Sequence, residues 1–223
     1  MILTALESHG LEVNPSKCEL FLIRPQSIQC REALDSFKSI TDRVKLIEKD
    51  KLTLLGAPIF PEAMNEVLGS KLENLELMAI RLKSVDNHAA LYLLKNCFAM
   101  PKLTYFLKLS PCFMKSDILH KYDSIIKESL TKNLNIKIPE QAWNQASLPV
   151  SKGGLGLRPA IEIALSGYLS SVTASFSIAQ SLLPLHFRNQ RDRHFNTAVD
   201  EWKIRSGQVE LPQINLFSLN GIS

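Results

Sequence analysis

The carboxylate and histidine side chains of this chain do not follow the spacings that support catalysis. Two-metal phosphoryl transfer needs carboxylates that converge on ions about 4 Å apart, yet the sequence holds no Asp-Asp pair and no DxD motif. The five histidines form no HxxxH or HExxH motif, and GxSxG and GK[ST] motifs are missing from the sequence. We therefore expect no complete catalytic centre, no metal site, no cofactor and no small-molecule ligand.

The segment SKGGLGL, residues 151–157, contains three glycines that admit two interpretations. In the first, the backbone N–H groups around Gly153, Gly154 and Gly156 approach a phosphate. In the second, the glycines form a turn with positive φ that places Leu155 and Leu157 in the core. The second is favoured, because the segment lacks a GK[ST] ending and follows no clear strand.

Lysines gather between residues 95 and 137, where eight lysines and three acidic residues give a net charge of +5. This exceeds the net charge of +4 of the whole chain. Lysines on helices suit sequence-independent contact with phosphates, but a solvated helical face has the same composition. Both interpretations stay open. The candidate nucleic-acid-binding lysines are Lys95, Lys102, Lys108, Lys115 and Lys121.

The elements that position these residues change in character near residue 60. Before it, segments 18–23, 44–47 and 52–59 have the composition of short strands, and a turn at 49–51 predicts a hairpin between the last two. After it, apolar residues recur at steps of three and four, which predicts long helices beginning at Pro61 and Ser116. Asp86 is expected to cap a further helix that Pro101 interrupts. The fold class is mainly α with a small N-terminal β element (α+β).

The chain divides by this pattern into residues 1–60, residues 61–138 and a connection with C-terminal helices at 139–223. Residues 163–187 carry no charge and are long enough to span a bilayer. Six serines and a single apolar seam instead favour a packed helix and no membrane partner. Four widely spaced cysteines predict reduced thiols and an intracellular protein.

Three segments together resemble reverse transcriptases of non-LTR retrotransposons. GLEVNPSKCELFLI (10–23) resembles the stretch after the catalytic hairpin, LTLLGAPI (52–59) resembles the primer grip, and QASLPVSKGGLGLRPA (145–160) resembles a segment after the thumb. The resemblance implies that Lys17 is the palm lysine that assists departure of pyrophosphate. It also implies that Leu55, Gly56 and Ala57 form the primer-grip turn. Remnant palm strands would then precede a thumb-like helical bundle at 61–134.

The family's catalytic carboxylates lie upstream of the first matching segment, so a magnesium site would need residues that this sequence does not contain. The resemblance implies a truncated or partial reverse transcriptase-like protein of retroelement origin, without polymerase activity on its own, that retains binding to RNA or an RNA–DNA duplex. A palm–thumb junction would pack Leu55 and Leu68 against the N-terminal strands. The alternative is a non-catalytic helical module that binds nucleic acid or pairs its apolar seams with a partner protein.

Overall fold

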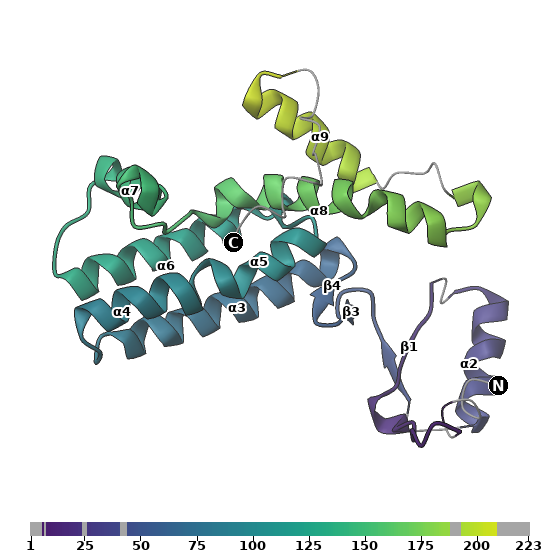
Figure 1. The fold of residues 1–223 in the computed structure, drawn as a ribbon. Coiled ribbons are helices and arrows are strands. Elements are labelled where there is room, and N and C mark those ends of the chain that lie inside the picture. Colours follow the sequence, from purple (N-terminus) through teal and green to yellow (C-terminus); the bar gives the residue numbers. More distant parts are fainter. Residues whose placement is uncertain (1–5, 7, 24–25, 41–43, 188–192, 209–223) are drawn as a thin grey trace.

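The structure, a computed structural model, describes residues 6, 8–23, 26–40, 44–187 and 193–208. Helices dominate these residues and short strands occur only in the first part, which confirms a mainly α fold with a small β element (Figure 1). The N-terminal elements are η1 (Pro15–Lys17), β1 (Glu19–Phe21), α2 (Ile28–Ile40), β2 (Lys45–Ile47), β3 (Thr53–Leu54) and β4 (Ala57–Pro58). The helical elements are α3 (Pro61–Leu82), α4 (Asn87–Leu93), the π-helix η2 (Leu94–Phe98), α5 (Met100–Leu109), η3 (Cys112–Met114), α6 (Ser116–Leu134), α7 (Glu140–Ser147), η4 (Val150–Lys152), α8 (Ala160–Leu182), η5 (Leu185–Phe187) and α9 (Arg193–Ser206).

The strands form two separate pairs. β1 and β2 pair in parallel, and β3 and β4 pair antiparallel. The predicted hairpin between 44–47 and 52–59 is therefore wrong. Segment 52–59 folds back on itself instead, because Leu55 and Gly56 adopt φ values of 51° and 80° that close a two-residue turn. Pro58, which has no N–H to donate, is the last residue of β4.

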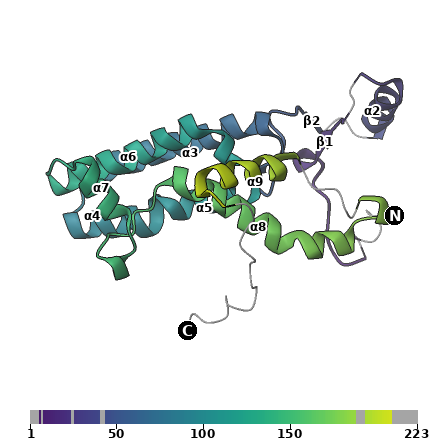
Figure 2. The ribbon, with the colours of Figure 1, turned by 90° about the horizontal axis from the view of Figure 1, so that it is seen from above.

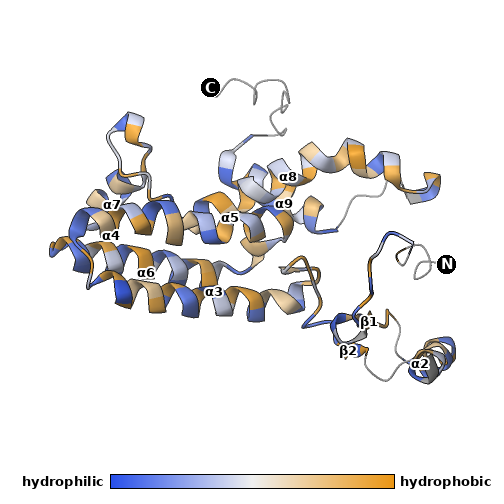
Figure 3. Cartoon of the chain, turned by 60° about the horizontal axis from the view of Figure 1, so that its bottom comes forward, coloured by the Kyte–Doolittle hydropathy of each residue, from blue (hydrophilic) through white to orange (hydrophobic). Residues whose placement is uncertain are grey.

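The parallel pair and α2 lie apart from the helical bundle (Figures 1 and 3). One link between them is a ring contact of 5.5 Å between Phe21 of β1 and Phe60, which directly precedes α3. Leu68 is buried among the helices and Leu55 is exposed, so neither shows the packing expected of a palm–thumb junction. The N-terminal strands meet the bundle through Phe60 instead.

The bundle is built on two helix pairs, α3 with α6 and α5 with α8, which Figure 2 shows from above. Met64, Leu68, Leu75 and Leu82 face the core at helical spacing, as the sequence predicts for α3. The hydrophobic core is continuous from Met64 to Ala198. Helices from both 61–138 and 139–223 therefore contribute to one core.

The helix after α3 is capped and interrupted where the sequence predicts. The carboxylate of Asp86 accepts hydrogen bonds of 3.1 Å from the N–H groups of His88 and Ala89. After Leu93 the α-helix changes to the π-helix η2. Pro101 then lies in the first turn of α5. The hydroxyl of Tyr122 donates to the carbonyls of Phe98 and Ala99 at 3.0 and 2.9 Å. These bonds satisfy carbonyl groups at the break and fix its geometry.

α8 has two different halves. Its first half is buried against the bundle through residues such as Ala164, Leu165 and Leu169. Its second half extends past the bundle, where Ile178 and Leu182 are 64% and 80% exposed and hydrophobic residues alternate with polar ones (Figure 3). By length and composition α8 could cross a membrane. The packing of its first half is that of a core helix, and the expectation of no membrane partner stays a prediction.

Candidate nucleic-acid interface

The turn between β3 and β4 holds an apolar side chain in solvent. Leu55 adopts φ 51°, and its side chain is 88% exposed. The left-handed region costs a residue with a Cβ about 1–2 kcal/mol. Asn-Gly is the usual sequence for such a turn, because asparagine tolerates this region better. Strained backbone of this kind is concentrated at functional sites, which makes Leu55 a candidate contact residue.

The hairpin is anchored by two hydrogen bonds, one from α5 and one from Ser110, the residue that follows α5. The hydroxyl of Tyr105 donates to the carbonyl of Leu55 at 3.1 Å, and the hydroxyl of Ser110 donates to the carbonyl of Pro58 at 2.7 Å. Ala57 is buried at 6% exposure. Of the three predicted primer-grip residues, Leu55 and Gly56 therefore face solvent and Ala57 anchors the hairpin from inside.

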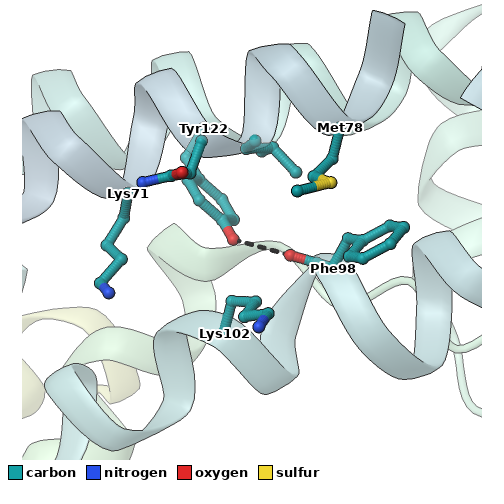
Figure 4. Close-up of a pocket in the computed structure, with 7 residues that line it drawn as sticks. Lys71, Met78, Phe98, Lys102 and Tyr122 are labelled. Carbon is teal, nitrogen blue, oxygen red and sulfur yellow. Dashed lines mark hydrogen bonds between the residues drawn. The ribbon is translucent and has the colours of Figure 1, made fainter. Parts of the chain in front are cut away.

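Lys71 of α3 connects this turn to the predicted lysines. Together with Gly56 and Lys51 it lines a cavity of about 260 Å³. Together with Lys102 and Tyr122 it lines a second cavity of about 220 Å³ (Figure 4). We give the name hairpin–lysine surface to Leu55, Gly56, Lys71, Lys102 and Tyr105, which these two cavities and the Tyr105–Leu55 hydrogen bond connect.

The two lysines of the hairpin–lysine surface differ electrostatically from Lys127 and Lys132 of α6. Lys127 pairs with Glu140 at 2.5 Å and Lys132 pairs with Glu128. In the described part of the chain, Lys71 and Lys102 form no ion pair with an acidic side chain. The Lys71 ammonium instead lies 4.7 Å from the centre of the Phe106 ring. Both charges are thus available to an anion.

The remaining predicted lysines are dispersed. Lys95 of η2 lies against the glycine loop, where a Cβ on Gly156 would come within 3.1 Å of its Cε. Lys108 and Lys121 are exposed on α5 and α6, and Lys115 is half-buried between η3 and α6. Lys17 is exposed in η1, in the N-terminal segment. No contact described for these residues joins them to the hairpin–lysine surface.

Sequence reasoning missed Lys71, because this lysine lies outside the lysine-rich segment 95–137. No motif marks it, and only the packing of α3 beside α5 places it next to Lys102. Tyr105 was not among the predicted site residues either, because its hydrogen bond to the carbonyl of Leu55, 50 positions away, has no local signal.

The glycine loop at 151–157 uses its backbone N–H groups internally. Each N–H group donates to a backbone carbonyl at 2.8–3.1 Å. The pairs are Gly153 to the carbonyl of Val150, Gly154 to that of Pro149, Leu155 to that of Ala146 and Gly156 to that of Leu148. A phosphate held through free N–H groups would need these bonds to open. The geometry is that of the turn interpretation, with φ of 77° and 75° at the first and last glycine and with Leu157 buried.

Asp123 of α6 is a second residue whose role the sequence did not reveal. Its buried carboxylate accepts hydrogen bonds from the N–H groups of Ala160 and Ile161 at 2.6 and 3.1 Å. It thereby caps α8 at the point where the glycine loop ends. Burial raises the pKa of the Asp123 carboxyl above its usual range, and the two N–H donors offset part of that effect.

The residues that the structure describes do not fit a magnesium ion. Among them, no group of three or more His, Cys, Asp or Glu side chains could hold a metal.

Burial raises the pKa of the Cys112 thiol to about 12, so this buried cysteine is a poor nucleophile.

Comparisons with protein-family models, with curated proteins and with solved structures found no match.

Proposed function

We propose that this chain is a reverse transcriptase-like protein of retroelement origin that binds an RNA–DNA duplex or RNA and lacks polymerase activity on its own. The observation that carries the proposal is the strained, exposed Leu55 held by Tyr105 beside the unpaired charges of Lys71 and Lys102. A turn that keeps an apolar side chain in solvent is suited to a partner that covers it.

The hairpin–lysine surface suits a nucleic-acid end. Two lysines supply charge for phosphates, which gives affinity without sequence preference. Leu55 supplies an apolar contact for a sugar or base edge next to them. In the reverse transcriptase interpretation, Leu55 and Gly56 contact the primer end, while α3 and α5 follow its backbone.

Binding of a labelled RNA–DNA duplex across a range of salt concentrations tests the proposal. We expect the logarithm of the association constant to fall linearly with the logarithm of salt concentration, because each phosphate contact releases counterions. Affinity that does not respond to salt would contradict this. Extension of a primed RNA template by the purified chain would overturn the absence of polymerase activity.

The alternative of a protein-interaction module is favoured by a different surface. The outer half of α8 exposes Ile178 and Leu182, and Leu185 of η5 is 78% exposed beside it in sequence. This face would pair with an apolar helix of another protein or of a second copy. A monodisperse monomer by light scattering counts against it, whereas an oligomer that Leu182→Lys dissociates supports it.

A further inference from the structure

The cavity between α3 and α5 combines charge and apolar surface at opposite ends. Figure 4 shows Lys71 at one end, the Phe98 ring and Met78 at the other, and Lys102 along the side between them. Tyr122 forms the wall, and its hydroxyl is committed to the carbonyls of Phe98 and Ala99. The wall is therefore fixed before any ligand enters.

The polar groups of the cavity select an anion with a hydrogen-bond donor. Lys71 and Lys102 line it without an acidic residue among the lining side chains. Asn74 donates through its amide nitrogen to the carbonyl of Ser70 at 2.7 Å, which directs the amide's other group, its oxygen, to act as an acceptor. A ligand that suits the two lysines carries negative charge, and a hydrogen-bond donor on it has the Asn74 oxygen as a further partner.

The size of the cavity limits the ligand further. A volume of about 220 Å³ lies below the range of about 300 Å³ and above that holds drug-sized ligands. It suits one planar group that packs against Met78 and the Phe98 ring. Aromatic side chains bind nucleobases by such stacking, whatever the sequence.

We propose that this cavity binds a single unpaired nucleotide, with its phosphate at Lys71 and Lys102 and its base against Met78 and Phe98. The proposal rests on the proposed nucleic-acid binding and adds to it a preference for an unpaired base. This cavity adjoins the hairpin turn, because Lys71 lines it and also lines the cavity that contains Gly56. A strand that leaves the duplex at Leu55 would thus have an adjacent site for its first unpaired nucleotide.

The test compares two labelled single strands of equal length and charge, one with normal bases and one abasic throughout, with the full chain. We expect the base-bearing strand to bind about tenfold more tightly, since stacking of even one base contributes at this level. Met78→Trp fills the cavity and should abolish the preference. Leu77→Trp is the matched control, because the neighbouring Leu77 is exposed on α3 and does not line the cavity.

Binding of an RNA–DNA duplex by the same variants separates this inference from the proposed function. Met78→Trp should leave duplex affinity within twofold of wild type while it removes the preference for bases. Equal binding of the two single strands by the wild-type chain, with intact duplex binding, would overturn the nucleotide site alone. Failure of all three nucleic acids to bind would overturn both proposals.

Discussion

The hairpin turn at Leu55–Gly56 and the glycine loop at 153–156 both contain residues with positive φ, yet they differ in what the conformation accomplishes. In the glycine loop the unusual angles fall on Gly153 and Gly156, and the N–H groups bond to backbone carbonyls. In the hairpin one of them falls on a leucine that projects into solvent. The comparison teaches that the loop places positive φ on residues without a Cβ, whereas the hairpin places it on an exposed leucine, a cost that the proposed nucleic-acid partner would offset.

The largest effect is expected in the glycine loop. A Cβ on Gly154 would lie 2.0 Å from the carbonyl oxygen of Leu148, so Gly154→Ala must displace backbone. We expect a loss of about 3 kcal/mol in the free energy of unfolding, measured by urea denaturation. Gly69→Ala in α3 is the control, because its Cβ meets nothing within 4 Å and alanine favours a helix by about 1 kcal/mol. Equal stability of both variants would contradict the structural role of the loop.

Asp123 caps α8 directly after that loop, and Asp123→Asn should cost about 2 kcal/mol. The amide oxygen can accept one of the two N–H bonds, but its NH₂ group faces the second donor, and a buried donor left without a partner costs about 1–3 kcal/mol. Asp200→Asn, on the exposed face of α9, should change stability by less than about 0.5 kcal/mol. A similar small change for Asp123→Asn would show that the cap is dispensable.

The same variant makes a prediction about pH. Burial raises the pKa of the Asp123 carboxyl, so the folded chain keeps this proton to a higher pH than the unfolded chain does. The contribution of Asp123 to the free energy of unfolding is then largest below the unfolded pKa near 3.8 and falls as pH rises through the folded value. The stability gap between wild type and Asp123→Asn should therefore narrow as pH rises above the unfolded pKa of 3.8. A gap that widens over this range would reverse the assigned direction.

At the hairpin, Leu55→Asn should act in opposite directions on stability and binding. Asparagine tolerates positive φ, so the variant should gain about 1 kcal/mol in the free energy of unfolding. It should also bind the RNA–DNA duplex more weakly, because the apolar contact is removed. Leu54→Asn in β3 removes a leucine that is 64% exposed without relieving strain, and it should bring no gain in stability. Loss of stability in Leu55→Asn would show that the leucine serves the fold.

The sequence predicted much of the fold, because helical periodicity and capping are local signals. Pro61, Asp86 and Pro101 each act in the structure as their positions in the sequence predict. Strand pairing was partly wrong, because a leucine at positive φ is not a recognised turn signal and segment 52–59 was interpreted as one strand.

The candidate site was harder to predict for a physical reason. Its residues come from three elements, and the bonds that join them span long distances along the chain. Leu55 and Gly56 were predicted from the resemblance to reverse transcriptases, and Lys102 was predicted from the net positive charge of residues 95–137. Lys71 and the Tyr105 bond to Leu55 depend on how α3, α5 and the hairpin pack, which no local pattern records.

The central claim is tested most directly by the salt dependence of RNA–DNA duplex binding in two double variants. One replaces two lysines that form no ion pair with any residue the structure describes, and the other replaces two lysines that pair with glutamates. The account predicts that Lys71→Gln/Lys102→Gln makes the plot of log association constant against log salt concentration shallower by about 2, since each lost phosphate contact removes about 0.9 from the slope. The double variant Lys127→Gln/Lys132→Gln removes two lysines that pair with Glu140 and Glu128, and it should leave the slope nearly unchanged. Equal slopes for the two double variants would contradict the hairpin–lysine surface as the nucleic-acid site.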